Sequence, residues 1–253
     1  LSGEDAGRGT FSHRHAAWHN MNRRQRSEGI YIPLKNAQNK SWFGVYDSIL
    51  NEEGVLGFEY GYSLENIHNL TIWEGQFGDF ANGAQVMIDQ FIISGEAKWG
   101  SLSRLTMILP HGFDGQGPEH SSARIERFLQ LAAENNIIAV IPSTAAQMFH
   151  LIRRQAKSNY AKPLMIFLSK RLLRFKDAMS DVSELTNGVF LPLIADTTAA
   201  TSAKRVIVCT GQVYYDLVKA RAERNLTETV AIVRVEQLYP LPEAEIRSII
   251  KQY

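Results

Sequence analysis

Residues 47–80 read DSILNEEGVLGFEYGYSLENIHNLTIWEGQFGDF, and this stretch decides the fold. Two carboxylates, Glu52 and Glu53, open an apolar segment that is punctuated by glycine, which predicts a helix entered from the end of a strand. The short apolar run 70–74 then predicts a buried strand, with 75–79 as its exit loop. A strand, a helix and a second strand in this order are the beginning of a layered α/β fold.

Aromatic side chains follow the second of these strands, at Phe77 and Phe80. A carboxylate such as Glu52 and a nearby aromatic face could together hold a flat, protonatable heteroaromatic ring, because the carboxylate can bond a ring nitrogen while the aromatic face stacks on the ring. The same pattern also fits a solvated helix start with an aromatic core behind it, since acidic residues are common at helix N-termini. The residues alone favour this second interpretation.

The rest of the chain repeats the alternation of strands and helices. Residues 1–40 are polar and predict irregular structure, and 177–204 have little periodicity and predict a linker. Buried apolar strands that alternate with helices predict a parallel sheet covered on both faces. We expect further strands at 105–109, 137–141, 163–168, 205–210 and 230–235, and helices at 82–94, 123–135, 145–157 and 213–225 and after the turn 238–242.

Composition narrows the class of protein. The 253 residues suffice for one large or two medium domains, and a formal net charge of +1 gives no electrostatic case for nucleic-acid binding. The single cysteine, Cys209, excludes an internal disulfide and predicts a buried thiol. No apolar run reaches the roughly 20 residues that span a bilayer. The chain opens without Met or a signal-peptide pattern and stops inside a helical pattern, so we expect a piece of a longer polypeptide.

Histidines in two regions of the chain are candidates for ligand binding. His13, His15 and His19 have a spacing that does not put all three on one helix face, so we favour anion contact or packing over metal binding. The glycine-rich stretch 110–124 lacks the dinucleotide fingerprint. Its His120 precedes a predicted helix and could meet a carboxylate or oxyanion, or make loop hydrogen bonds. Ser121 or Ser122 could cap that helix.

Several segments together resemble one family, the E1 component of 2-oxoglutarate dehydrogenase, a thiamine-diphosphate enzyme of the transketolase-like group. The resemblance runs from Leu1 to Tyr253. The stretch PHGFDGQGPEHSSAR is long and chemically unusual, which makes the match specific. The segments are RGTF (8–11), RHA (14–16), FEYGY (58–62), IWEGQFGDFANGAQ (72–85), IDQFI (88–92), PHGFDGQGPEHSSAR (110–124) and VEQLYPLP (235–242).

The resemblance implies a fold of class α/β in two parts. Residues 1–180 would be a parallel-sheet, transketolase-like pyrimidine-binding domain, 181–203 a linker, and 204–253 the N-terminal part of a C-terminal α/β domain. The family's diphosphate-binding domain, with its GDG…N magnesium motif, has no counterpart here, since no GDG occurs in the sequence. We therefore expect the ligands of Mg²⁺ to lie outside this chain and the chain alone to be inactive.

The resemblance also implies roles for individual residues. Glu52 matches the glutamate that hydrogen-bonds the aminopyrimidine ring of thiamine diphosphate. Its neighbour Glu53 competes for this role, but the family's Glu-x-Gly pattern ends at Gly54 and favours Glu52.

Other residues match the surroundings of that ring. Gln76, Phe77 and Phe80 match the segment that lines the ring and stacks on it. His120 matches a histidine that contacts the 2-oxo acid, and Arg14 and His15 match a region near the site.

The activity implied is decarboxylation of 2-oxoglutarate and transfer of the succinyl group to the lipoyl group of an E2 partner in the citric acid cycle. A homodimer is expected, in the cytoplasm of a bacterium or the mitochondrial matrix of a eukaryote, with no nucleic-acid or membrane partner. An E1 for 2-oxoadipate, one methylene longer, and a non-catalytic assembly domain remain as alternatives. A plain nucleotide-binding Rossmann domain fits least, because the fingerprint is absent.

Overall fold

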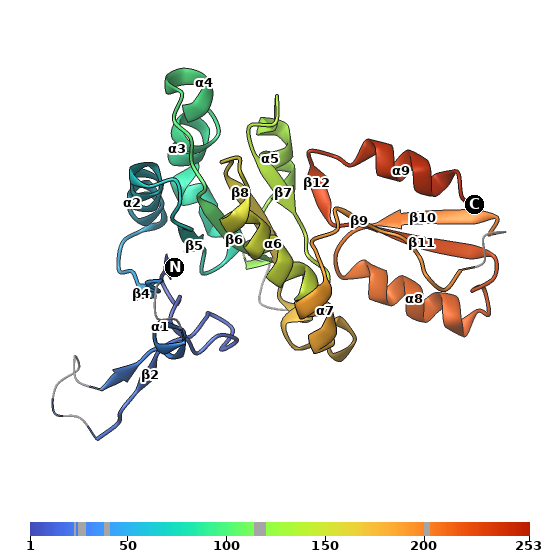
Figure 1. Cartoon of the computed structure of the whole chain (residues 1–253), viewed down its shortest axis with the longest axis horizontal. Coiled ribbons are helices and arrows are strands. Elements are labelled where there is room, and N and C mark those ends of the chain that lie inside the picture. Colours follow the sequence, from blue (N-terminus) through green and yellow to red (C-terminus); the bar gives the residue numbers. More distant parts are fainter. Residues whose placement is uncertain (23, 25–28, 38–40, 114–119, 200–202) are drawn as a thin grey trace.

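The computed structural model describes residues 1–22, 24, 29–37, 41–113, 120–199 and 203–253 (Figure 1). Within them a seven-stranded sheet has the order β12-β7-β8-β6-β5-β1-β4, in which β12 is antiparallel to its neighbour and the other strands run parallel. The predicted parallel α/β sheet is thus confirmed. Its strands are β1 (Ser2–Gly3), β4 (Tyr46–Asp47), β5 (Ile72–Glu74), β6 (Thr106–His111), β7 (Ile138–Val140), β8 (Leu164–Ser169) and β12 (Gln237–Tyr239).

A second, smaller sheet follows toward the C-terminus. It consists of β9 (Leu193–Ile194), β10 (Arg205–Cys209) and β11 (Val230–Val235), and β10 and β11 are parallel as predicted. Figure 1 shows α8 (Val213–Glu223) and α9 (Glu243–Ile250) on opposite sides of this sheet. A short hairpin, β2 (Trp18–His19) and β3 (Ile30–Tyr31), projects from the first sheet beside α1 (Pro33–Asn36).

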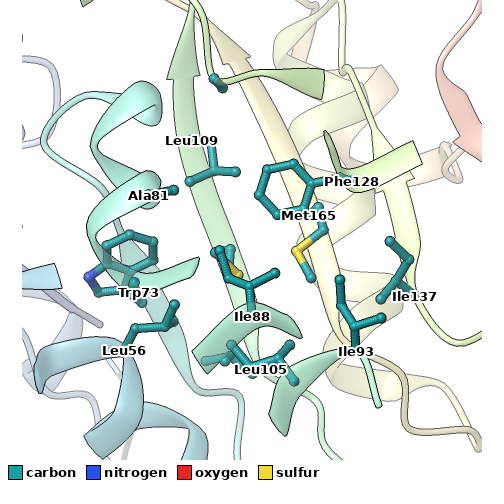
Figure 2. Close-up of a cluster of buried hydrophobic side chains, with 14 of the residues drawn as sticks. Leu56, Trp73, Ala81, Ile88, Ile93, Leu105, Leu109, Phe128, Ile137 and Met165 are labelled. Carbon is teal, nitrogen blue, oxygen red and sulfur yellow. The ribbon is translucent and has the colours of Figure 1, made fainter. Parts of the chain in front are cut away.

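Both faces of the large sheet are buried, as a parallel sheet requires. Alternate residues of β6 point to opposite sides: Leu109 belongs to the core cluster that includes Leu56 of α2 (Glu52–Glu65), whereas Ile108 belongs to the cluster that includes Leu151 of α6 (Ala145–Lys157). Figure 2 shows the first of these clusters, where Leu56, Ile88 and Phe128 point toward Leu109 of β6, Met165 of β8 and Leu105, which directly precedes β6.

Capping residues set the starts of the long helices. The Thr144 hydroxyl accepts from the backbone N–H of Gln147, and α6 has the predicted bounds. The Asn51 side chain accepts from the N–H of Gly54 at 2.9 Å, so α2 begins at Glu52. The acidic pair therefore occupies the first turn of α2, where the helix dipole stabilises negative charge.

The predicted continuous helix over 82–94 is wrong in detail. The segment forms a 3₁₀ helix η1 (Gly78–Ala84), one α-turn α3 (Gln85–Met87) and a π-helical turn η2 (Ile88–Ile92), followed by α4 (Gly95–Trp99). Its apolar residues Ile88 and Ile92 are buried, but Val86 is exposed. Asn82 and Gly83 are weak helix formers, which leaves the segment free to follow the core instead of an ideal helix.

The predicted helix over 123–135 is shorter than expected, α5 (Ile125–Leu131), and neither serine caps it. Its N-cap residue, Arg124, has a left-handed backbone with φ of 57°. The N–H of Ala123 is taken by the Nδ1 atom of His111 at 3.1 Å instead of joining a helix. Ser122 accepts from the N–H of Arg124, which forms a turn before the helix starts.

The segment 177–204 carries regular structure where a linker was expected. After two 3₁₀ turns, η4 (Arg171–Arg174) and η5 (Lys176–Ala178), Asp181 and Glu184 form a capping box that starts α7 (Val182–Asn187). Strand β9 then pairs antiparallel with β11, so part of the segment belongs to the second sheet. The capping box was visible in the sequence as an Asp-x-x-Glu pattern.

The two sheets are joined by buried polar contacts and by β12. Strand β12 leaves the second sheet and pairs with β7 of the first. Glu236 is fully buried and accepts from the N–H of Ser143 at 2.7 Å and from its hydroxyl at 2.5 Å, while the hydroxyl of Tyr215 donates to the Ser143 carbonyl at 2.6 Å.

Cys209 is half-buried in β10, where burial raises the pKa of its thiol to about 11. In the described part of the chain, no helix is both long and apolar enough to cross a membrane.

Candidate functional site

Four strand ends meet at one edge of the large sheet. Strands β6, β5, β1 and β4 are neighbours and parallel, so their carboxyl ends lie together. Ligands of open parallel sheets bind outside such an edge. The segments that leave this edge carry Glu52 after β4, residues 5–16 after β1, Phe77 and Phe80 after β5, and His120 after β6.

The two glutamates at the start of α2 have different surroundings. Glu52 is half-buried, and its Oε2 atom lies 3.5 Å from the position that a Cβ of Gly83 would occupy, so its side chain lies against η1. Glu53 is exposed. Among the residues that the structure describes, the Glu52 carboxylate makes no hydrogen bond or ion pair. It is therefore a carboxylate that is available to a ligand beside η1.

The rings of Phe77, Phe80 and His120 form one cluster. The imidazole stacks on Phe77, with ring centroids 4.1 Å apart and an interplanar angle of 23°, and meets Phe80 edge-on at 5.3 Å. The two phenylalanines are 5.5 Å apart in a T-shaped contact. A fourth ring, Phe11, meets Phe77 edge-on at 5.8 Å and was not predicted from the sequence. The structure thus brings together three of the predicted residues, with the histidine on the face of Phe77.

Close backbone approach brings His120 to this edge. A Cβ at Gly78 would lie 2.4 Å from the Pro110 carbonyl oxygen and 2.5 Å from the Cβ of Ala123, so only glycine lets η1 pack this near the end of β6. The N–H of Gly112 donates to the Ser121 carbonyl at 2.9 Å, which closes the loop. Lys170 donates to the carbonyl of His120 at 2.9 Å. Residues 114–119 of the predicted glycine-rich loop lie outside the described residues.

Gln76 is turned toward the loop after β1. Its Nε2 atom donates to the Asp5 carboxylate at 3.2 Å. Its role as a residue that lines the ring site, predicted from the sequence, stays a prediction. His15 has a left-handed backbone with φ of 47°, and its carbonyl accepts from the Trp18 indole at 2.8 Å.

Arg14 is part of a buried polar cluster with Glu74 and His13. It forms an ion pair with Glu74 and donates to the Ala6 carbonyl at 2.8 Å. Glu74 is 3 % exposed, and burial raises the pKa of its carboxyl while the neighbouring Arg14 opposes the rise. Burial, followed by the charge of Arg14, lowers the pKa of His13 to about 4, so its imidazole is neutral at neutral pH. Sequence reasoning missed Glu74, although a carboxylate that ends a buried strand is itself a signal. His13, for which anion contact or packing was expected, lies 3.6 Å from the Glu74 carboxylate.

The described residues contain no group of three or more His, Cys, Asp or Glu side chains arranged to hold a metal ion. The geometry that remains is a half-buried carboxylate at a helix start, which lies against η1, and a cluster of rings to which Phe80 of η1 belongs. These groups suit a flat heteroaromatic ligand with a nitrogen that can accept or share a proton.

Comparison with known proteins gives two family matches. The family described as transketolase, pyrimidine binding domain matches residues 1–176, and the family described as 2-oxoglutarate dehydrogenase C-terminal matches residues 179–253. Three curated relatives carry the name 2-oxoglutarate dehydrogenase E1 component. They come from Cupriavidus necator (56 % identical), Haemophilus influenzae (52 %) and Azotobacter vinelandii (52 %). Each comparison covers 100 % of this chain and 27 % of the relative, so the chain spans about a quarter of their length.

Proposed function

Since this chain belongs to the transketolase pyrimidine-binding family, among the 2-oxoglutarate dehydrogenase E1 components, we propose that it holds the aminopyrimidine ring of thiamine diphosphate in such an enzyme. The observation that carries the proposal is the meeting of Glu52 and the ring cluster of Phe77, Phe80 and His120 at the carboxyl edge of one parallel sheet. We propose with it a pyrimidine-binding domain over 1–180 and a C-terminal part over 204–253; the segment 181–203 connects them and contributes β9 to the second sheet.

The residues present fit this cofactor. The Glu52 carboxylate is half-buried and makes no hydrogen bond within the described chain, so it can accept one from a protonated ring nitrogen of the aminopyrimidine. Phe77 and Phe80 offer aromatic surface beside it, and Gln76 can border the ring. When bound, thiamine diphosphate supplies the electron sink for loss of carbon dioxide from a 2-oxo acid.

The residues of this chain position the cofactor ring and the substrate, exclude water from the ring and hold protons. Glu52 holds a proton at the ring nitrogen, where a carboxylate partly removed from water bonds more strongly than an exposed one. His120 presents an imidazole at the same edge, where it can donate to a carboxylate or carbonyl oxygen of the 2-oxo acid. The two phenylalanines keep water from the face of the ring that they cover.

The whole enzyme would decarboxylate 2-oxoglutarate and transfer the succinyl group to a lipoyl-bearing E2 partner. Mg²⁺ would accompany the diphosphate, held by parts of the enzyme outside this chain. We further propose a homodimer in the cytoplasm of a bacterium, or in the mitochondrial matrix if the source is eukaryotic. The names of the relatives, and their bacterial sources, support the activity and the bacterial location.

The alternative substrate is 2-oxoadipate. One methylene is worth only about 1–3 kcal/mol of discrimination, so the family match alone does not separate the two acids. A non-catalytic assembly role is the second alternative, and the Glu52 carboxylate beside the ring cluster argues against it, because an assembly domain has no need of that arrangement.

The experiment uses a full-length E1 that carries this chain. Thiamine-diphosphate binding is measured by calorimetry with Mg²⁺, and carbon dioxide release is measured with 2-oxoglutarate and 2-oxoadipate on the same preparation. The proposal predicts cofactor binding and a higher kcat/KM for 2-oxoglutarate. Binding with a preference for 2-oxoadipate would replace the substrate, and absence of cofactor binding would refute the assignment of the site.

A further inference from the structure

The segment that leaves β1, residues 5–16, is fastened to the exit of β5 at several points. Asp5 accepts from Gln76 at 3.2 Å. Arg14 forms an ion pair with Glu74, and Nε2 of His13 lies 3.6 Å from the other oxygen of that carboxylate. These partners are about sixty to seventy positions apart in the sequence, so the contacts join two separate exits of the sheet.

Glu74 is the buried member of this fastening. A carboxylate removed from water is costly unless a charged partner and hydrogen bonds compensate it, and removing one partner of a buried pair is strongly destabilising. Arg14 supplies that compensation and in turn donates to the Ala6 carbonyl within the same loop. The guanidinium therefore connects the buried strand end to both ends of the segment 5–16.

The loop holds its own shape around His13. Gly9 has φ of 78°, and a Cβ there would lie 2.5 Å from the His13 ring, so the chain folds directly over the imidazole. From the other side Arg174, an exposed residue after β8, donates to the carbonyls of Phe11 and, at 3.3 Å, of Ser12. Arg174 therefore holds the backbone of Phe11 from outside the loop, in addition to the contacts within it.

The ring of Phe11 is the point where this loop reaches the functional site. It meets Phe77 edge-on at 5.8 Å with an interplanar angle of 77°. Phe77 carries His120 on its face and Phe80 at its edge. Phe11 thus adds a fourth ring to the cluster.

We propose that Glu74 is a positioning residue of this site: through Arg14 and His13 it fixes the loop 5–16, so that Phe11 holds the ring of Phe77 in place. The consequence for cofactor affinity rests on the proposed function; the placement of Phe77 does not. A structural carboxylate that only stabilises the fold would change the stability of the protein without changing the surroundings of Phe77.

The test places 4-fluorophenylalanine at position 77 of a full-length E1 that carries this chain. Its ¹⁹F resonance is recorded without cofactor in four backgrounds: unsubstituted, Glu74→Gln, Phe11→Leu and the double variant. Thiamine-diphosphate affinity is measured on the same variants with the natural Phe77. Asp196→Asn is the matched control, because Asp196 forms a comparable buried ion pair with Arg221 in the second sheet region, away from the ring cluster.

The expected result is a shifted or broadened resonance in Glu74→Gln and in Phe11→Leu, with no further change in the double variant. The dissociation constant of thiamine diphosphate should rise roughly 2- to 13-fold in each, the range for loss of one aromatic contact. Asp196→Asn should leave both readouts as they are. Arg174→Gln changes an exposed side chain and should move the resonance in the same direction, which keeps the test decisive where Glu74→Gln folds poorly.

Two outcomes would overturn the proposal: a lowered melting temperature with an unmoved resonance in the folded Glu74→Gln protein, or effects of Glu74→Gln and Phe11→Leu that simply add. A resonance that responds to Glu74→Gln in a protein that binds no thiamine diphosphate would support the positioning role. It would at the same time refute the cofactor assignment, so the two failures are distinguishable.

Discussion

Replacing His120 tests two roles of its imidazole separately: contact with neighbouring rings and donation of a proton or hydrogen bond to the substrate. The imidazole stacks on Phe77 at 4.1 Å and meets Phe80 at 5.3 Å, so His120→Ala removes two ring contacts as well as a proton carrier. One aromatic pair is worth about 0.5–1.5 kcal/mol, which is roughly a 2- to 13-fold change in an equilibrium constant. A positioned donor or proton carrier is worth about 10²-fold or more in rate. We therefore expect turnover to fall about 10²-fold. Both ring contacts are between protein side chains and affect the cofactor only through the placement of the phenylalanines, so cofactor affinity should fall by no more than the roughly 13-fold that one pair is worth.

His120→Phe is the matched control, because it keeps a ring of similar size and removes the nitrogens. It should restore most of the thiamine-diphosphate affinity and none of the turnover. Both variants are compared by calorimetric titration of the cofactor and by carbon dioxide release from 2-oxoglutarate at saturating cofactor, in a full-length E1 that carries this chain. Lys170 contacts the His120 backbone carbonyl, which neither substitution removes.

Wild-type turnover in His120→Phe would refute the reasoning, since it would leave the nitrogens without a role in the reaction. A collapse of cofactor affinity in His120→Ala, with unchanged turnover of the saturated enzyme, would instead assign the residue to the cofactor's surroundings.

Three further predictions concern stability, each followed by urea unfolding. Leu151→Ala empties a fully buried position between α6 and the sheet and should cost about 2–5 kcal/mol with little change in the m-value; a cost below about 1 kcal/mol would contradict the two-faced core. Asp196→Ala leaves the buried guanidinium of Arg221 without its carboxylate and should cost about 3–5 kcal/mol, and a silent substitution would show that the pair is not closed in solution. Burial and then Arg14 lower the pKa of His13 to about 4 from an ordinary 6.5. The contribution of the neutral ring to the free energy of unfolding is therefore fully present above pH 6.5 and is lost as the pH falls through about 4. His13→Gln should flatten the pH dependence in that window, and an unchanged slope would mean that the ring is solvated.

The core of the large sheet was predictable because its signals are local. Strand β6 contains the apolar run 107–110 and β8 the apolar run 164–168, and α6 has both an amphipathic pattern and a Thr144 cap. The acidic pair at the start of α2 and the rings after β5 could also be found from the sequence, since each follows a strand directly. Their meeting at one edge follows from the parallel order of the strands.

The features that were missed depend on contacts far apart in the sequence. Strand β1 has two residues, too few to show a period, and becomes a strand because β4 and β5 flank it. Strand β12 is recruited by β7, about a hundred residues earlier in the chain. The ion pair of Arg14 with Glu74 joins the segment after β1 to the end of β5, and the sequence around neither residue indicates this pairing.

The central claim, that this edge of the sheet holds the aminopyrimidine ring through Glu52, is tested most directly by comparing Glu52→Gln with Glu53→Gln. Both glutamates lie in the first turn of α2, where each contributes about 0.3–1 kcal/mol through the helix dipole, so both variants should lose a similar, small amount of stability. Turnover of 2-oxoglutarate should fall about 10²–10⁴-fold in Glu52→Gln and stay within about twofold of wild type in Glu53→Gln. Equal turnover in the two variants, or loss in Glu53→Gln alone, would contradict the account.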